Sequence, residues 1–195
     1  MPPQALTTAS LVAGLGGAWY FFHGTPVQFS AIAAATAFSC IEYTWYSLTT
    51  EDADGDVHFT PFQATCRAGH TTWAQFWANV LYTPVLLHTY RAVVPHPILR
   101  VLCFPLNIWL LEIVEGYTLI YLFGRNIAWT YKTTDAYCHG NIRLGFWKLW
   151  LALGLVLELT GYAALDALGA SCAAAISLPL VLAVYGAAFF AFQRR

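Results

Sequence analysis

Charged side chains are scarce in this chain, because only 10% of its residues are Asp, Glu, Lys or Arg while 58% are hydrophobic. An average soluble domain carries about 25% charged residues, so the composition excludes an ordinary soluble domain and indicates an integral membrane protein. The length of 195 residues accommodates roughly six spanning helices of about 20 residues each, joined by short loops. We therefore expect one all-α membrane domain over residues 1–195, built as a polytopic helical bundle.

Clusters of basic residues are absent too, and the formal net charge is -1. Binding to nucleic acid requires grouped Lys and Arg side chains that displace counterions, so a nucleic-acid partner is excluded. The chain also lacks a glycine-rich phosphate loop with a Walker lysine, and it lacks a G-x-S-x-G nucleophile motif. We expect no intrinsic ATPase, and no motif assigns a catalytic residue.

Close pairs of metal-binding residues are missing as well. The five cysteines are widely spaced and form no C-x-x-C pair: Cys40, Cys66, Cys103, Cys138 and Cys172. We interpret them as small packing residues rather than disulfides or metal ligands.

His139 has no second histidine at helical spacing, so a histidine-rich metal site is not expected. The acidic stretch at 51–58 lacks the Gly and Glu spacing of an EF-hand and predicts a solvated turn. These patterns identify no cofactor.

Apolar runs bounded by Gly, Pro or charged residues predict the membrane spans. They cover residues 9–23, 27–48, 71–90, 98–123, 142–165 and 171–193. The first run is short and rich in glycine, so it is either a span or an interfacial helix.

Lys and Arg are more frequent on the side of the membrane that holds the loops at 49–70 and 124–141 than on the other side, which makes that side cytoplasm-like. With six spans, both termini lie on this same side of an unidentified membrane. Aromatic pairs at segment ends, such as Trp147 and Trp150, are interpreted as interfacial anchors.

The chain resembles itself when it is shifted by 70 residues. Glu42 then aligns with Glu112, and the pair Phe76-Trp77 aligns with Phe146-Trp147. Each unit is predicted to hold a glutamate-bearing span, a polar loop and a return helix. The units are residues 26–95 and 96–165, followed by a C-terminal span at 171–193. Either an internal duplication or a shared bias toward aromatic residues explains the identities, and a duplication predicts a shared centre between the two units.

Four acidic residues fall inside predicted spans, namely Glu42, Glu112, Glu115 and Glu158. An ionised carboxylate at mid-bilayer costs about 2.5–3.5 kcal/mol on insertion scales, so such groups usually face the bundle interior. Glu112 and Glu115 share one helix face with Gly116, which allows a neighbouring backbone to approach closely. In one interpretation these carboxyls share a proton or bind a cation or another ligand. In the other they are hydrogen-bonded packing groups between helices.

A second group of polar residues lies in the loop at 124–148, where we expect a polar rim. Its members are Arg125, Trp129, Tyr131, His139 and Arg143, and the loop also holds the polar residues Lys132, Asp135 and Asn141. The basic side chains are expected to contact a lipid phosphate at the cytoplasmic surface. In an alternative, Arg143 folds inward and neutralises a glutamate. His139 precedes Gly140 and is interpreted as a structural residue in a tight turn rather than a ligand.

The run WLLEIVEGYTLIYLFGRNIAWTYKTTDAYCHGNIRLGFWKLW resembles the core of the transmembrane protein 229 family and of its bacterial relatives, the type IV ABC-transporter membrane proteins. The shared pattern begins with a helix that carries Glu112 and, four residues later, Gly116. A loop with the motif W-x-Y follows, here Trp129 and Tyr131. The motif G-x-I-x-L then leads into the next helix, here Gly140, Ile142 and Leu144. The likeness covers about residues 35–155. Where the family has an acidic residue between Trp and Tyr this chain has Thr130, and it has Glu115 where the family is commonly uncharged. The resemblance implies a fold more firmly than an activity.

These patterns predict that the chain binds or moves a lipid-soluble or cationic ligand at intramembrane carboxylates. Glu42 and Glu112 are the expected proton or cation groups, and Glu115 is expected to modulate them. Membrane lipids and other membrane-protein subunits are the expected partners. Two alternatives stay open. One is an accessory structural subunit of a larger membrane complex, and the other is a lipid-modifying enzyme that uses His139 and a glutamate as acid and base.

Overall fold

The computed structural model describes residues 25–52, 56–61, 76, 79–80, 82–126 and 128–192. Helices make up most of this part of the chain, which confirms the all-α class, and its strands form two small hairpins. The predicted span at 9–23 lies outside the described residues. Much of the loop at 49–70, with Cys66, and the start of the predicted span at 71–90 lie outside them too.

The first described helix, α2, runs from Pro26 to Leu48 and covers the predicted span at 27–48. It begins with a capping box, in which the Gln28 amide donates to Thr25 Oγ1 at 3.4 Å and the Thr25 amide donates to Gln28 Oε1 at 2.6 Å. Proline suits the first helical position, because its missing amide hydrogen has no partner there in any case. The sequence TPVQ therefore fixes where α2 starts.

An antiparallel hairpin follows α2 and consists of β1 (Thr49–Glu51) and β2 (Val57–Phe59). Asp52 and Asp56 at its turn are exposed, and the Asp56 amide donates to Asp52 Oδ1 at 2.9 Å. This arrangement agrees with the solvated acidic turn expected from the sequence.

The next described elements are the π-helix η1 (Pro84–Thr89) and the short helix α4 (Tyr90–Val93). The helix α5 then runs from Pro97 to Phe123, close to the predicted span at 98–123. It ends at Gly124, whose φ of 76° lies in the left-handed region that glycine adopts without strain. Two further strands, β3 (Ala136–Tyr137) and β4 (Ile142–Arg143), form the second hairpin.

A long continuous helical stretch follows this hairpin. It comprises the 3-10 turn η2 (Leu144–Phe146), α6 (Trp147–Val156), the π-helical η3 (Leu157–Gly161) and α7 (Tyr162–Ala175). The helix therefore continues beyond the boundary predicted at residue 165. Gly161 and Gly169 lie inside it, so neither glycine ends the helix. The last helix, α8, runs from Leu178 to Phe192.

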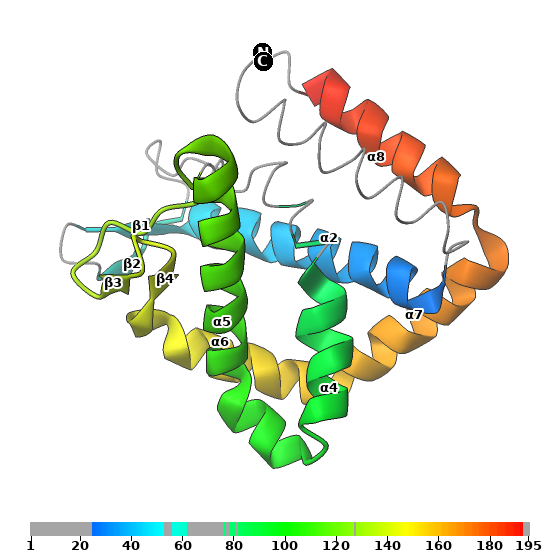
Figure 1. The fold of residues 1–195 in the computed structure, drawn as a ribbon, viewed down its shortest axis with the longest axis horizontal. Helices are drawn as coiled ribbons and strands as arrows, with labels where there is room; N and C mark the ends of the chain where they lie inside the picture. Colours follow the sequence, from blue (N-terminus) through cyan, green and yellow to red (C-terminus); the bar gives the residue numbers. More distant parts are fainter. Residues whose placement is uncertain are drawn as a thin grey trace.

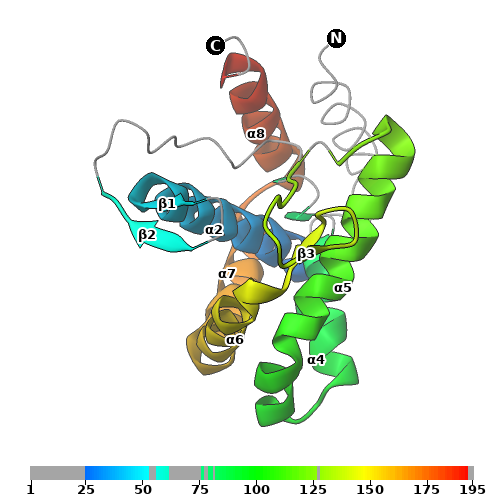
Figure 2. The same cartoon turned by 90° about the vertical axis from the view of Figure 1, so that its left-hand side faces the viewer.

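Helix packing groups the elements into crossing pairs, which Figures 1 and 2 show from two directions. α2 packs against α7, and α5 packs against α6. At the second contact, a Cβ on Gly154 would lie 2.7 Å from the Cβ of Phe104, so glycine is what allows the ring to approach. Buried apolar residues form one core around α2 and α8 and a second around Tyr90, Phe104 and Ile108.

Two helices in the described part of the chain are long and apolar enough to cross a membrane. They span Pro97–Phe123 and Leu144–Ala175, and Leu178–Ala188 forms a shorter apolar helix. This finding supports a membrane association, whereas the predicted count of six spans is not confirmed. α2 is long enough, but Gln28, Ser30 and Glu42 make it less apolar.

The two predicted 70-residue units share an order of elements. α2 and α5 are each followed by a two-stranded hairpin, and each unit also contains a π-helical segment, η1 or η3. The internal duplication itself stays a prediction.

Candidate functional site

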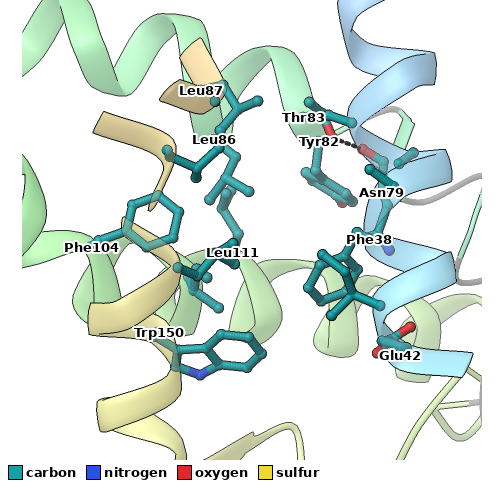
Figure 3. A pocket seen from close by; sticks show the side chains of 18 of the residues that line it. Phe38, Glu42, Asn79, Tyr82, Thr83, Leu86, Leu87, Phe104, Leu111 and Trp150 are labelled. Atoms are coloured by element: carbon teal, nitrogen blue, oxygen red, sulfur yellow. Dashed lines mark hydrogen bonds between the residues drawn. The ribbon is translucent and has the colours of Figure 1, made fainter. Parts of the chain in front are cut away.

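A cavity of about 340 Å³ lies where α2, η1, α5, α6 and η3 meet. Figure 3 shows Phe38 and Glu42 of α2 on one side of the space, with Phe104, Leu111 and Trp150 on the opposite side. Small-molecule sites in proteins measure about 300–1,000 Å³, so this cavity has room for a small ligand. Both π-helical segments contribute to its wall, and π-helical turns are frequent at functional sites.

Three carboxyl groups from two different helices line this cavity. Glu42 comes from α2, and Glu112 and Glu115 come from α5. The sequence predicted that all three would face the interior, and the structure brings them to the lining of one cavity. Their meeting depends on how α2 and α5 are placed around the cavity, which sequence spacing alone does not give.

Two of the carboxyl oxygens are buried without a hydrogen-bond partner within the described part of the chain. Glu115 is 5% exposed, and its Oε1 has no donor. Glu112 accepts a hydrogen bond at Oε1 from the Tyr131 hydroxyl at 3.2 Å, while its Oε2 has no donor. A buried polar atom without a partner costs about 1–3 kcal/mol. Such oxygens at a cavity wall are the groups that a bound donor or cation would satisfy.

Trp150 is half-buried and lines the cavity, although the sequence suggested an interfacial anchor. Its ring is 6.3 Å from that of Phe38 and 6.0 Å from that of Phe146, measured between centroids. Tyr131 extends this group, because its ring lies 5.6 Å from that of Phe146. Of the pair Trp147 and Trp150, only Trp147 is exposed. The aromatic composition did not distinguish the two, because both lie near the start of an apolar helix.

Gly116 faces the loop that carries Trp129 and Tyr131, and Asn141 is its contact. Asn141 is 0% exposed, and a Cβ on Gly116 would lie 2.3 Å from its side chain. The Trp129 indole donates to the Asn141 carbonyl at 2.8 Å, and Asn126 Nδ2 donates to Asn141 Oδ1 at 3.0 Å. A side chain, and not a neighbouring backbone as expected, occupies the space that Gly116 leaves.

The tight turn expected at His139 is present. Cys138, His139 and Gly140 have φ values of 54°, 62° and 77°, three consecutive residues in the left-handed region. His139 is exposed, and its Nδ1 lies 3.1 Å from the Tyr117 hydroxyl. It contributes nothing to the cavity wall, so the turn places it on the outer side of the loop.

Arg143 pairs with Asp135 rather than with a cavity glutamate. The two side chains are 3.2 Å apart, and the guanidinium lies 4.5 Å from the centre of the Phe146 ring. Although burial disfavours the charged carboxylate, hydrogen bonds from neighbouring groups, including the Gly145 amide and Arg143, hold the pKa of Asp135 below its usual range. Arg125 is exposed. Of the five predicted rim residues, only Trp129 and Tyr131 line the cavity.

Glu158 is separate from the three cavity carboxyls and has its own partner. Arg100 contacts it through Nη2 and through Nε, the latter at 2.9 Å. Arg100 also donates to the carbonyls of Val94 and Pro95 at 3.0 and 2.7 Å. This ion pair joins the start of α5 to η3, and the 58 residues between its members hide it from pattern analysis.

Residues from the second half of the predicted span at 71–90 complete the cavity wall, and sequence analysis did not single them out. Asn79, Tyr82 and Thr83 supply uncharged polar groups, and Thr83 Oγ1 donates to the Asn79 carbonyl, as Figure 3 shows. Phe38 was missed too, although it lies four residues before Glu42 and so on the same helical face. No group of three or more His, Cys, Asp or Glu side chains suited to a metal ion occurs among the described residues.

We expect Gly116→Ala to destabilise the loop that closes the cavity. The new methyl group would overlap the Asn141 side chain, which must rotate and give up its hydrogen bond from Asn126. Overpacking of this kind costs about 1–3 kcal/mol, and we expect the lower half of that range because a side chain yields more easily than a backbone. Thermal unfolding in detergent micelles measures the effect. Gly186→Ala is the matched control, since no atom of the described residues lies within 4 Å of its Cβ position. Equal stability of the two variants would contradict the contact.

Comparisons with known proteins return no matching family model, no matching curated protein and no matching solved structure. The function of the chain is therefore inferred from the cavity and the residues around it.

Proposed function

We propose that this chain is a polytopic membrane protein, similar to the transmembrane protein 229 family, that binds or moves a lipid-soluble or cationic ligand at its intramembrane carboxylates. The observation that carries the proposal is the pair of buried carboxyl oxygens, Glu115 Oε1 and Glu112 Oε2, at the wall of a ligand-sized cavity, for which the described residues supply no donor. A group that served packing alone would be expected to have its hydrogen bonds satisfied.

In this proposal each carboxyl group has its own role. Glu112 is held by the Tyr131 hydroxyl at one oxygen, which fixes the side chain and leaves the second oxygen for the ligand. Glu42 approaches from α2, so that the ligand would bridge two helices. Glu115 lies next to Glu112 on α5 and modulates the other two carboxyls. A ligand with hydrogen-bond donors or positive charge would offset the desolvation of these carboxyls.

The proposal places the chain in a membrane through six spans, with both termini and the loop at 124–141 on a cytoplasm-like side. The two long apolar helices, Pro97–Phe123 and Leu144–Ala175, support it. The outward face of α5 supports it as well, because it exposes a row of large apolar side chains that suits lipid tails: Leu99, Leu102, Leu106, Leu110 and Val114.

Replacement of Glu112 by Gln tests the proposal. The amide keeps the size of the side chain and removes its charge, so we expect the variant to fold and to lose the bound ligand. The measurement is mass spectrometry of small molecules that co-purify with the wild-type protein and with the variant, at equal protein amounts. Asp166→Asn is the control, because Asp166 is an exposed carboxylate paired with Arg91 away from the cavity. If Glu112→Gln retains as much of every co-purifying compound as the wild type does, the site is wrong.

An accessory structural subunit is the second candidate, and the same row of exposed apolar residues on α5 favours it. That surface fits an apolar helix of a larger membrane complex as well as it fits lipid. In that case the cavity carboxyls would be packing groups, and stoichiometric partner subunits would co-purify with the chain.

A further inference from the structure

We propose that the ligand is an amphiphile with a cationic head, a protonated amine or a quaternary ammonium, whose head lies between the cavity carboxyls and Trp150 and whose apolar tail lies along the leucine-lined end. This inference rests on the proposed function and specifies its ligand class. Charge, aromatic rings and the division of the cavity into two ends each support it.

The described residues of the cavity wall that can carry a charge near neutral pH are all acidic. Glu42, Glu112 and Glu115 line it, and no Lys, Arg or His does so among the described residues. An anionic head such as a carboxylate or a phosphate would face three carboxyls without a counter-charge. A neutral lipid with one hydroxyl would satisfy at most one of the two donor-free oxygens. A cationic head offsets the negative charge of the whole group.

Aromatic rings stand next to these carboxyls. Trp150, Phe38, Trp129 and Tyr131 all line the cavity, and Figure 3 places Trp150 and Phe38 on facing sides of the space, near Glu42. A cation beside an aromatic ring is attracted by the negative face of the ring, most strongly for Trp and when water is excluded. Rings together with carboxylates are the combination that binds substituted ammonium groups. A bare metal ion would instead require several oxygen ligands converging on one point.

At the opposite end of the cavity, apolar side chains lie beside the polar Tyr82 and Thr83. Leu86 and Leu87 come from η1, Phe104 from α5, and Leu153 and Leu157 from α6 and η3. Figure 3 shows Leu86 and Leu87 at the end away from Glu42 and Trp150. An alkyl tail would bury its CH₂ groups against these side chains. The cavity thus has one end with carboxyls and aromatic rings and another end where leucine side chains gather, and these match the two parts of a cationic amphiphile.

Competition among three probes of similar chain length tests the head group. The probes are octyltrimethylammonium, its uncharged isostere with carbon in place of nitrogen, and octanoate. Each competes with tritium-labelled octyltrimethylammonium for the full chain in maltoside micelles, which contain no amine, and binding to empty micelles is subtracted. We expect the cation to compete at a concentration at least about tenfold below that of the isostere. Octanoate is expected to compete no better than the isostere.

Two variants and two matched controls locate the site. Glu115→Gln and Trp150→Leu are each expected to weaken binding of octyltrimethylammonium about tenfold. Asp166→Asn and Trp147→Leu change the same residue types outside the cavity and should bind within about twofold of the wild type. If Glu115→Gln fails to fold, Trp150→Leu and the three-probe comparison on the wild type still decide the question.

The failures of the two proposals are distinguishable. If the isostere or octanoate competes as well as the cation, the ligand is not a cationic amphiphile. The proposed function would still stand in that case, provided that Glu112→Gln loses a compound that co-purifies with the wild type. If octyltrimethylammonium shows no saturable binding, or binds both cavity variants as tightly as the wild type, the cationic class is overturned as well. If the proposed function fails, Glu112→Gln retains every co-purifying compound.

Discussion

Replacing Glu158 with Gln is expected to lower the free energy of unfolding by about 3–5 kcal/mol, because it leaves the Arg100 guanidinium charged and largely buried. The two side chains are 14% and 18% exposed, and they meet through two contacts. The remaining partners of Arg100 on its own side of the pair are the carbonyls of Val94 and Pro95, which carry no net charge. Glutamine keeps the shape of the side chain, so the loss of stability can be assigned to the missing negative charge.

A second ion pair in the same region provides the control. Arg91 and Asp166 are 2.9 Å apart, but Asp166 is 45% exposed, so Asp166→Asn should cost only about 0–1 kcal/mol. Reversible unfolding of both variants in the same micelles gives the comparison. If Glu158→Gln costs no more than Asp166→Asn, the Arg100 pair is solvated and does not join α5 to η3.

Gly169→Ala is expected to separate α7 from α2. A Cβ at this position would lie 2.3 Å from the backbone oxygen of Pro26 and 3.2 Å from the Cβ of Ser30. A backbone oxygen at the capped start of a helix cannot rotate away as a side chain can, so the helices themselves must move apart. Overpacking of buried contacts typically costs about 1–3 kcal/mol, and we expect the upper end of that range here.

Gly186→Ala again supplies the reference, because none of the described residues crowds its Cβ position and alanine favours a helix over glycine by about 1 kcal/mol. The measured quantity is the difference in thermal unfolding temperature between the two variants. Gly186→Ala should match or exceed the wild type, while Gly169→Ala falls below it. A Gly169→Ala variant as stable as the wild type would mean that α2 and α7 do not meet as closely as described.

Much of the helical framework could be predicted, because long apolar runs report membrane-length helices directly. The runs at 27–48 and 98–123 correspond to α2 and α5 within a few residues. The inward direction of Glu42, Glu112 and Glu115 followed from the cost of exposing a carboxyl to lipid. Their meeting at one cavity did not follow, because it depends on how α2 and α5 are placed around the cavity.

Other features could not be predicted, because they depend on contacts between distant residues. Glu158 looked like a further intramembrane acid until Arg100, 58 residues earlier, proved to be its partner. Trp150 looked like an interfacial anchor, and only its contact with Phe38 on another helix places it at the cavity wall. Asn141 carried no recognisable pattern, yet it contacts Gly116 and accepts a hydrogen bond from Trp129. Composition reports the environment of a segment, but not the neighbours of one side chain.

The central claim is that this chain holds a small ligand at the cavity formed by α2, α5 and α6. The most direct measurement is native mass spectrometry of the protein extracted from its own membrane in mild detergent. Our account predicts a particle of the 21.6 kDa chain, or a small multiple of it, carrying a bound small molecule that Glu112→Gln loses. A large particle with stoichiometric partner subunits and no bound small molecule would contradict it and would make the chain an accessory subunit.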